Sequence, residues 1–558
     1  MNNYEKFGLK SYGAIPNERQ MEWYNREKMI FFHFGMNTFT NKEWGDGNED
    51  PKTFNPTDLD VRSWVRLIRD AGFKCAILTA KHHDGFCLWQ TKWTEHSIKN
   101  SPYKNGKGDI VREFTDACRE YGIKAGIYLS PWDRHEKTWG KDEYNDFYVG
   151  QLTELLTNYG KIWECWWDGA GSTEAVYDWE RWAKTVKTLQ PDATIFGSLG
   201  ATPWVDVRWV GNEKGIAGKP CYATIDSSSL VYEYTNELNS GKIGGERFIP
   251  AEVDVSIRPG WFYHSEQDKD VRTPENLINL FFTSNGSNAG FLLNLPPDRR
   301  GLIHENDQKS LLEFNRILTK ALSNNYVENA KITATTERHG CEAQNLKNID
   351  PVSIYAPLDT DKCPEILIEL PCETEINAIM ISELIELGHK IVGIEAYALK
   401  NGEWKQILNS EIVGYKLCER FDNTVTDKVK IKITKSLDTP AIRSVGLYRF
   451  EQNSDTASKN IKKSNLLENE SAQVVTDKNS FDINLGGVYS FNEITLEGVG
   501  ECTYSVSVFN GSSFENLTQG KSDTNDLKIV FDSEIDWAYR IKLTLDKEVT
   551  NDMKLTVK

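Results

Sequence analysis

The sequence predicts an irregular (β/α)8 TIM-like barrel followed by two all-β sandwich domains. Up to residue 322, short apolar runs alternate with amphipathic segments of helical period, a pattern typical of parallel strands joined by helices. Beyond that point apolar residues recur at every second position and helical periods disappear, which indicates antiparallel sheets. The chain has 558 residues, too many for one hydrophobic core, so several domains are expected.

Eight apolar runs are the expected barrel strands. Each is nearly continuous in apolar residues, as strands buried on both faces of a parallel sheet are. Eight strands joined by helices fit a closed (β/α)8 barrel. The runs are 29–35, 75–82, 124–131, 161–169, 193–198, 205–211, 246–255 and 289–297.

Amphipathic segments between these runs are the expected barrel helices. Asp109 is placed to cap one helix, and Gly72, Gly122 and Gly160 stand where left-handed C-caps belong. The segment 199–204 is too short for a helix, so the barrel is expected to be irregular. A doubly wound open sheet is the alternative fold, although no GxGxxG motif follows the first strand. The expected helices are 56–72, 108–122, 144–160, 174–191 and 273–286.

Strand-like alternation marks the C-terminal half, which a polar stretch at 451–472 divides. We expect a barrel domain at 1–322, a sandwich at 323–452, a linker at 453–467 and a second sandwich at 468–558. The alternating segments are EILIEL (365–370), KVKIKIT (428–434), EITLEG (493–498), LKIVFD (527–532) and YRIKLTLD (539–546).

Composition excludes several classes of partner. The net charge of −17 disfavours nucleic acid, and no apolar run is long enough for a membrane span.

The N-terminus lacks an apolar signal core, which favours a cytoplasmic protein if the sequence is complete, and a secreted or periplasmic one if a leader was removed. The ten cysteines form no CxxC pair and are expected to be buried free thiols. The oligomeric state is left open.

Polar and aromatic residues follow the predicted strands at their carboxyl ends, where barrel active sites form. Two of them, Asp168 and Glu213, are carboxylic acids that follow neighbouring parts of the barrel. Glycosidic bond cleavage needs one carboxylate at the anomeric centre and one acid for the leaving oxygen. An ionised Asp168 would favour a protonated Glu213. Histidines at these strand ends would hydrogen-bond sugar hydroxyls, and aromatic residues would line the same opening. The residues are His33, His82, His83, Tyr128, Trp166 and Trp261, and EWGDG (43–47) follows the first strand.

Each of these residues also has a plainer interpretation; His33 and Trp261, for example, are compatible with simple core packing. Asp168 before Gly169 is also compatible with a simple strand-to-loop turn. His82 and His83 with Asp84 are possible metal ligands, but adjacent side chains in a strand point to opposite faces. We therefore expect no metal, and we expect no cofactor because two acids suffice for glycosidic bond cleavage.

These motifs together resemble the α-L-fucosidases of glycoside hydrolase family 29. The resemblance covers roughly residues 8–320. It depends on FFHFGMNTF (31–39), EWGDG (43–47), AKHHDGFCLW (80–89), GIYLSPWD (126–133), WWDG (166–169) and SIRPGWFYH (256–264).

The resemblance implies a retaining double displacement on terminal α-L-fucose of fucosylated oligosaccharides or glycoconjugates. Asp168 corresponds to the family's nucleophile. Six residues correspond to positions around the fucose ring, and Glu43 and Trp44 are similar to a further pair in that pocket. The six are His33, His82, His83, Tyr128, Trp166 and Trp261. The acid/base position varies within the family. GNEKG (211–215) is similar to the branch that prefers α-1,3/4 linkages in Lewis-type glycans, which implies Glu213, with Glu246 and Glu252 as alternatives.

Residues 323–452 resemble a discoidin-type, galactose-binding-like sandwich, which would either bind sugar or brace the barrel. That resemblance depends on NGEWKQIL (401–408), GYKLCERFDNTVTDKVKIKIT (414–434) and AIRSVGLYRFE (441–451).

Three other functions of the whole chain stay open: a family member of broad specificity, a hydrolase for another sugar such as α-galactose, and a non-catalytic glycan-binding protein. A retaining enzyme would hold its two carboxyl groups about 5–5.5 Å apart.

Overall fold

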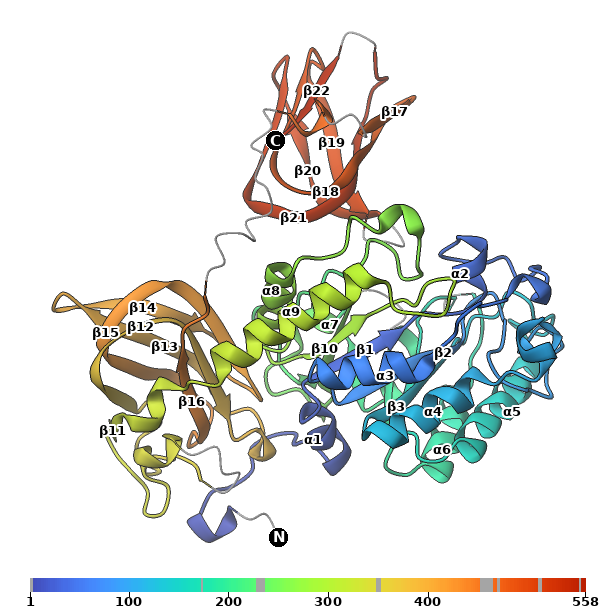
Figure 1. Cartoon of the computed structure of the whole chain (residues 1–558). Coiled ribbons are helices and arrows are strands. Elements are labelled where there is room, and N and C mark those ends of the chain that lie inside the picture. The colour runs from blue at the N-terminus through green and yellow to red at the C-terminus, as the bar shows by residue number, and fades with distance from the viewer. Residues whose placement is uncertain are drawn as a thin grey trace.

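Within the described residues, eight parallel strands close into a barrel (Figure 1). The structure is a computed structural model that describes residues 4–171, 174–226, 236–347, 353–451, 465–468, 472–509, 514–550 and 553–558. The strands follow one another around the barrel in chain order, and each overlaps one predicted run, which confirms the predicted fold class. They are β1 (Lys28–Phe32), β2 (Cys75–Lys81), β3 (Lys124–Leu129), β4 (Glu164–Trp167), β5 (Thr194–Gly197), β6 (Val207–Trp209), β9 (Ala251–Ser256) and β10 (Gly290–Asn294).

Helices surround the barrel, and most of them bury apolar faces in one core cluster with its strands. Their ends follow the capping residues of the sequence. The Asp109 side chain accepts a hydrogen bond from the Arg112 N–H at 2.8 Å, and Gly122 ends the same helix with φ of 70°. The helices are α1 (Glu18–Tyr24), α2 (Met36–Thr40), α3 (Val61–Asp70), α4 (Ile110–Tyr121), α5 (Glu143–Asn158), α6 (Trp179–Leu189), α7 (Asn236–Ser240), α8 (Pro274–Thr283) and α9 (Glu305–Leu322).

The barrel is irregular where the sequence predicted it. Only a 3₁₀ segment, Leu199–Trp204, joins β5 to β6. A long excursion then precedes β9 and contains the small antiparallel pair β7 (Thr224–Ile225) and β8 (Arg247–Phe248). None of the helices in the described ranges is both long and apolar enough to cross a lipid bilayer.

The first sandwich is built around two long, bent strands that pair with each other. Strand β12 pairs with β11 through its first half and with β16 through its second half. Its pairing with β15 shifts register between Glu369 and Thr374, and such irregularities let one strand bend from one layer into the other. The strands are β11 (Lys331–Ala334), β12 (Glu365–Glu383), β13 (Ile391–Lys400), β14 (Glu403–Ser410), β15 (Leu417–Ser436) and β16 (Ile442–Tyr448).

The second sandwich repeats the strand order of the first. The order is β11-β12-β15-β13-β14 with β16 on β12 in one domain, and β17-β18-β21-β19-β20 with β22 on β18 in the other. The segments LKIVFD and YRIKLTLD, which looked like separate strands, are the two halves of one bent strand. The strands are β17 (Gln473–Asp477), β18 (Ser480–Glu497), β19 (Cys502–Phe509), β20 (Phe514–Ser522), β21 (Leu527–Leu545) and β22 (Lys554–Val557).

The predicted linker, 453–467, lies outside the described residues except for 465–467. In that part, Leu466 is buried in the core of the second sandwich. Asn465 accepts a hydrogen bond from the Val557 N–H at 3.1 Å. The second domain therefore includes residues from 465 onward.

The first sandwich packs on the barrel face where the strands begin. The Asn288 N–H donates to the Lys416 carbonyl at 2.9 Å, and the Cys418 N–H donates to the Gly286 carbonyl at 2.7 Å. The rings of Tyr24 and Tyr415 stack with their centroids 4.5 Å apart. This face lies opposite the carboxyl ends of the strands, so the first sandwich braces the base of the barrel.

All ten cysteines are free, but they are not all buried as the sequence suggested. Cys363 and Cys372 are exposed. Cys363 precedes β12, and Cys372 lies at the bend of β12 between the two paired halves. Both sites are therefore away from the sheet interior.

Candidate active site

A cavity of about 740 Å³ opens at the carboxyl ends of the barrel strands. Aromatic rings form part of it, because Phe31 and Trp166 line the cavity and lie 5.1 Å apart in an edge-on contact. The tenth predicted residue, Tyr128, does not line the cavity but contacts Asp168. The predicted residues that line it are His33, Glu43, Trp44, His82, His83, Trp166, Asp168, Glu213 and Trp261.

Asp168 follows the last residue of β4 and holds its carboxylate in a fixed orientation. The Tyr128 hydroxyl donates to Oδ2 at 3.1 Å, and the Ala170 N–H donates to Oδ1 at 2.7 Å. The side chain is 27% exposed. Each oxygen therefore has a hydrogen-bond donor, and the group still reaches the cavity.

Glu213 lies in the loop after β6 and faces the same cavity. Its Oε2 accepts a hydrogen bond from the indole Nε1–H of Trp261 at 3.3 Å. The Trp261 ring is almost completely buried and lies 5.0 Å from the ring of His33. One aromatic wall thus contacts both a catalytic candidate and a sugar-binding candidate.

Glu43 holds the segment that carries Trp261. Its carboxylate accepts hydrogen bonds from the Trp261 N–H at 2.9 Å and the Phe262 N–H at 3.3 Å. It also contacts His264 Nε2 at 2.6 Å. Glu43 lines the cavity as predicted, and the geometry adds the role of positioning the Trp261 backbone.

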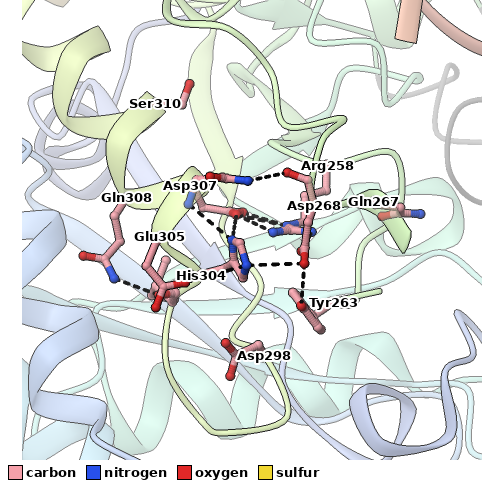
Figure 2. A network of polar contacts seen from close by, with 12 residues as sticks. Arg258, Tyr263, Gln267, Asp268, Asp298, His304, Glu305, Asp307, Gln308 and Ser310 are labelled. Carbon is pink, nitrogen blue, oxygen red and sulfur yellow. Dashed lines mark hydrogen bonds and ion pairs between the residues drawn. The ribbon is translucent and has the colours of Figure 1, made fainter. Parts of the chain in front are cut away.

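A buried ion network fixes the two ends of the same segment (Figure 2). The Arg258 guanidinium donates to both carboxylate oxygens of Asp307 on α9, with distances of 2.6–3.1 Å, and to Asp268 at 2.9 Å. Tyr263 and His304 also contact Asp268, at 3.2 and 3.3 Å. Arg258 and Asp307 are both fully buried. The Trp261 segment is therefore anchored to the barrel on two sides.

The three histidines present both donors and acceptors to the cavity. His33 Nδ1 donates to Asn294 Oδ1 at 2.8 Å, and His83 Nδ1 donates to Ser130 Oγ, whose own proton goes to the Trp132 carbonyl. His82 Nδ1 instead accepts from the Asn37 amide at 3.3 Å, which leaves its Nε2 protonated. Sugar hydroxyls need such a mixture of partners.

Burial keeps these imidazoles neutral. It lowers the pKa of His33 to about 3 and the pKa of His83 to about 4. The pKa of His82 also lies well below its usual value, chiefly because of burial. Their tautomers, rather than positive charges, therefore define what they can bind.

The sequence argument about His82 and His83 was wrong in one respect. Strand alternation would send adjacent side chains to opposite faces, but β2 ends at Lys81 and both histidines lie in the following turn. Their rings are 4.0 Å apart and both line the cavity. Among the described residues, no group of three His, Cys, Asp or Glu side chains is arranged to hold a metal ion.

The alternative acids lie outside the cavity. Glu246 is exposed, and Glu252 is fully buried in the barrel interior. Glu252 accepts hydrogen bonds from the indoles of Trp166 at 2.9 Å and Trp23 at 3.0 Å. Burial raises its pKa to about 7. It supports the Trp166 ring from below, whereas Glu213 faces the cavity.

Asp254 is a cavity residue that the sequence reasoning missed. It is buried, lines the cavity and accepts a hydrogen bond from the Trp209 Nε1–H at 2.8 Å. Burial first, and then the neighbouring Glu213, hold its pKa well above the usual value. The signal was present, because Glu252, Asp254 and Ser256 alternate with apolar residues along β9.

Comparison with known proteins relates this chain to α-L-fucosidases. Residues 5–321 match the family model Alpha-L-fucosidase. Alpha-L-fucosidase 1 of Arabidopsis thaliana is 39% identical over 447 residues, covering 78% of this chain and 87% of the plant protein. A putative alpha-L-fucosidase from Bacteroides thetaiotaomicron is similar in structure, with a TM-score of 0.78, 43% identity and coverage of 79% of this chain and 99% of its own. Another from Bacteroides ovatus has a TM-score of 0.70 and 34% identity and covers 100% of this chain and 98% of its own.

Proposed function

This chain belongs to the α-L-fucosidase family of glycoside hydrolases, and we propose that it removes terminal α-1,3/4-linked L-fucose from Lewis-type glycans with retention of configuration. The observation that carries the proposal is the pair of acids in one cavity. Asp168 and Glu213 face a space lined by neutral histidines and aromatic rings. Retaining hydrolysis needs two such carboxyl groups about 5–5.5 Å apart.

In the first step Asp168 attacks the anomeric carbon of fucose while Glu213 donates its proton to the departing oxygen. The C1–O bond to the rest of the glycan breaks, and a β-fucosyl ester forms on Asp168. The Tyr128 hydroxyl and the Ala170 N–H orient the attacking carboxylate. His33, His82 and His83 bind the sugar hydroxyls, and Trp261 contacts the C5 methyl group.

In the second step Glu213 takes a proton from water, and the resulting nucleophile attacks the same carbon. The ester bond to Asp168 breaks and α-L-fucose leaves. The Trp261 indole N–H donates to Glu213 Oε2 and so orients the Glu213 carboxyl group in both steps. The buried Asp254, whose pKa is raised, adds a third carboxyl group beside Glu213.

The α-1,3/4 preference is supported by the position of Glu213. It stands directly after the sixth barrel strand in GNEKG, an arrangement similar to the branch with that preference. A branched substrate also suits a cavity of about 740 Å³, a volume in the upper half of the range of small-molecule pockets, which is about 300–1,000 Å³.

Azide trapping tests the assignment of the two acids. With an aryl α-L-fucoside, Asp168→Ala should lose turnover by at least about 10³-fold and yield β-L-fucosyl azide when azide is added. Glu213→Ala should still form the ester and should yield α-L-fucosyl azide. The exposed Glu246→Ala variant is the control and should keep the rate of the unchanged enzyme.

Product analysis by NMR tests sugar, linkage and stereochemistry together. Lewis a and Lewis x trisaccharides should release α-L-fucose first, and 2′-fucosyllactose should react much more slowly. Release of β-L-fucose as the first anomer would contradict retention. Equal rates on all three substrates would contradict the linkage preference, and wild-type turnover by Asp168→Ala would remove the proposed nucleophile.

A further inference from the structure

Among the residues that the structure describes, Asn516 lines the cavity from outside the barrel domain. It lies on β20 of the second sandwich, yet it lines the same cavity as Asp168 and Glu213. Figure 1 shows this sandwich as a separate lobe beside the barrel. A domain that the chain reaches only after residue 464 therefore contributes to the wall of the catalytic cavity.

The Asn516 amide is held in place at an irregularity of its own hairpin. The pairing of β19 with β20 shifts register between Val506 and Ser507, and Ser507 pairs with Asn516. In the orientation that satisfies both ends of the amide, its nitrogen donates to the carbonyls of Val506 and Thr518 at 3.0 Å each. An amide fixed at a cavity wall is a suitable partner for sugar hydroxyls.

Asn516 belongs to the outward face of this sheet, as strand alternation shows. Val506, Ile541 and Leu543 point into the core of the sandwich. The intervening residues occupy the opposite face. This outward face carries Ser507, Phe509, Phe514, Asn516, Arg540 and Lys542.

The same face offers an aromatic surface next to Asn516. The rings of Phe509 and Phe514 lie 5.4 Å apart, and the Arg540 guanidinium lies 5.9 and 5.4 Å from their centroids. Arg540 also forms a two-pronged ion pair with Asp482, at 2.6 Å for each contact. Aromatic rings beside satisfied polar groups are suited to stack on the apolar faces of sugars.

We propose that this outward face, beginning at Asn516, binds the sugar units of the leaving group that lie beyond the fucose. The inference rests on the proposed function, because Glu213 protonates the leaving oxygen and so places the leaving group at the cavity mouth. The occupant is a neutral saccharide, since the guanidinium of Arg540 on this face is already paired with Asp482 and the chain as a whole has a net charge of −17. Recognition of an extended glycan would then combine two domains.

Kinetics with short and long substrates test this assignment in the full-length enzyme. The substrates are 4-nitrophenyl α-L-fucoside, the Lewis a trisaccharide, and the pentasaccharide that extends Lewis a by lactose. Asn516→Ala should raise KM for the pentasaccharide about five- to tenfold, and Phe514→Ala should raise it about tenfold, with little change for the aryl fucoside. Val530→Ala, an exposed valine elsewhere in the same domain, is the matched control.

The outcomes separate this inference from the proposed function. Unchanged pentasaccharide kinetics in both variants would overturn the subsite. Equal losses on the aryl fucoside and the pentasaccharide would also overturn it, because they would indicate a defect of the fold or the catalytic centre. If the unchanged enzyme released no fucose from any substrate, the proposed function itself would fail.

Discussion

The indole nitrogen of Trp261 donates a hydrogen bond to Glu213 over 3.3 Å, and this contact links two segments that are far apart in sequence. Glu213 belongs to the loop after β6, whereas Trp261 follows β9. The backbone of Trp261 is in turn held by Glu43, from the loop after β1. Three strand ends thus determine where one carboxyl group points.

We expect Trp261→Phe to lower kcat/KM about ten- to hundredfold, because it removes a hydrogen bond to an ionisable group while keeping an aromatic ring. Trp89→Phe is the matched control, since the Trp89 indole donates to Glu154 at 2.9 Å outside the cavity. Steady-state kinetics on the aryl fucoside would measure both. Equal activities of the two variants would show that the Trp261 contact does not serve catalysis.

Tyr128→Phe should lower kcat/KM about tenfold or more, because Asp168 loses one of its two hydrogen-bond donors. Tyr148→Phe provides the comparison. Its hydroxyl is also buried, but it donates to the Leu129 carbonyl at 2.7 Å. Both variants should lose similar thermal stability, and only Tyr128→Phe should lose activity. Activity losses of the same size would argue for a general effect of removing a buried hydroxyl.

Asp307→Asn should destabilise the protein by about 3–5 kcal/mol, because it removes the fully buried carboxylate that pairs with the fully buried Arg258 and leaves that guanidinium only the partly exposed Asp268. Glu305 lies two residues away on α9, and its side chain is largely exposed. Glu305→Gln weakens its pairs with Arg300 and His304, so it should cost at most about 1 kcal/mol. Urea unfolding followed by circular dichroism measures both. A cost below about 1 kcal/mol for Asp307→Asn would mean that the network of Figure 2 does not support the fold.

The pH dependence of stability should reveal the buried neutral histidines. Burial lowers the pKa of His83 to about 4, whereas an imidazole in the unfolded chain titrates near about 6.5. The unfolded chain therefore takes up a proton from about pH 6.5 downward, while the folded protein does so only near its folded pKa. This site lowers the free energy of unfolding as the pH falls through that window.

Replacement of His83 removes its contribution to the fall in the free energy of unfolding at low pH. The free energy of unfolding of the unchanged protein, minus that of His83→Asn, should therefore fall between pH 7 and pH 4. Urea titrations at several pH values would measure the difference. A difference that stays constant over this range would show that His83 is not held neutral by the fold.

Much of the architecture could be predicted because local patterns determine it. Apolar runs located all eight barrel strands, and the rule that polar residues gather at strand ends brought His33, Asp168 and Glu213 to one site. That rule fails inside a strand. Asp254 lies within β9, in a segment that we interpreted as continuously apolar, although its polar residues alternate.

The remaining errors have equally physical causes. The end of β2 at Lys81 decides the direction of His82 and His83, and sequence patterns do not locate strand ends to one residue. Asn516 could not have been predicted as a cavity residue, because the docking of one domain on another leaves no periodic signal in the sequence.

The seam between barrel and first sandwich limits how these modules can be recombined. Backbone amides cross it from Asn288 to Lys416 and from Cys418 to Gly286, and Tyr24 stacks on Tyr415. A cut after residue 322 would expose these groups to solvent on both fragments, at the end of the barrel opposite the cavity. A fusion protein that carries this barrel should therefore have its junction beyond residue 451, so that the barrel and the first sandwich are transferred together.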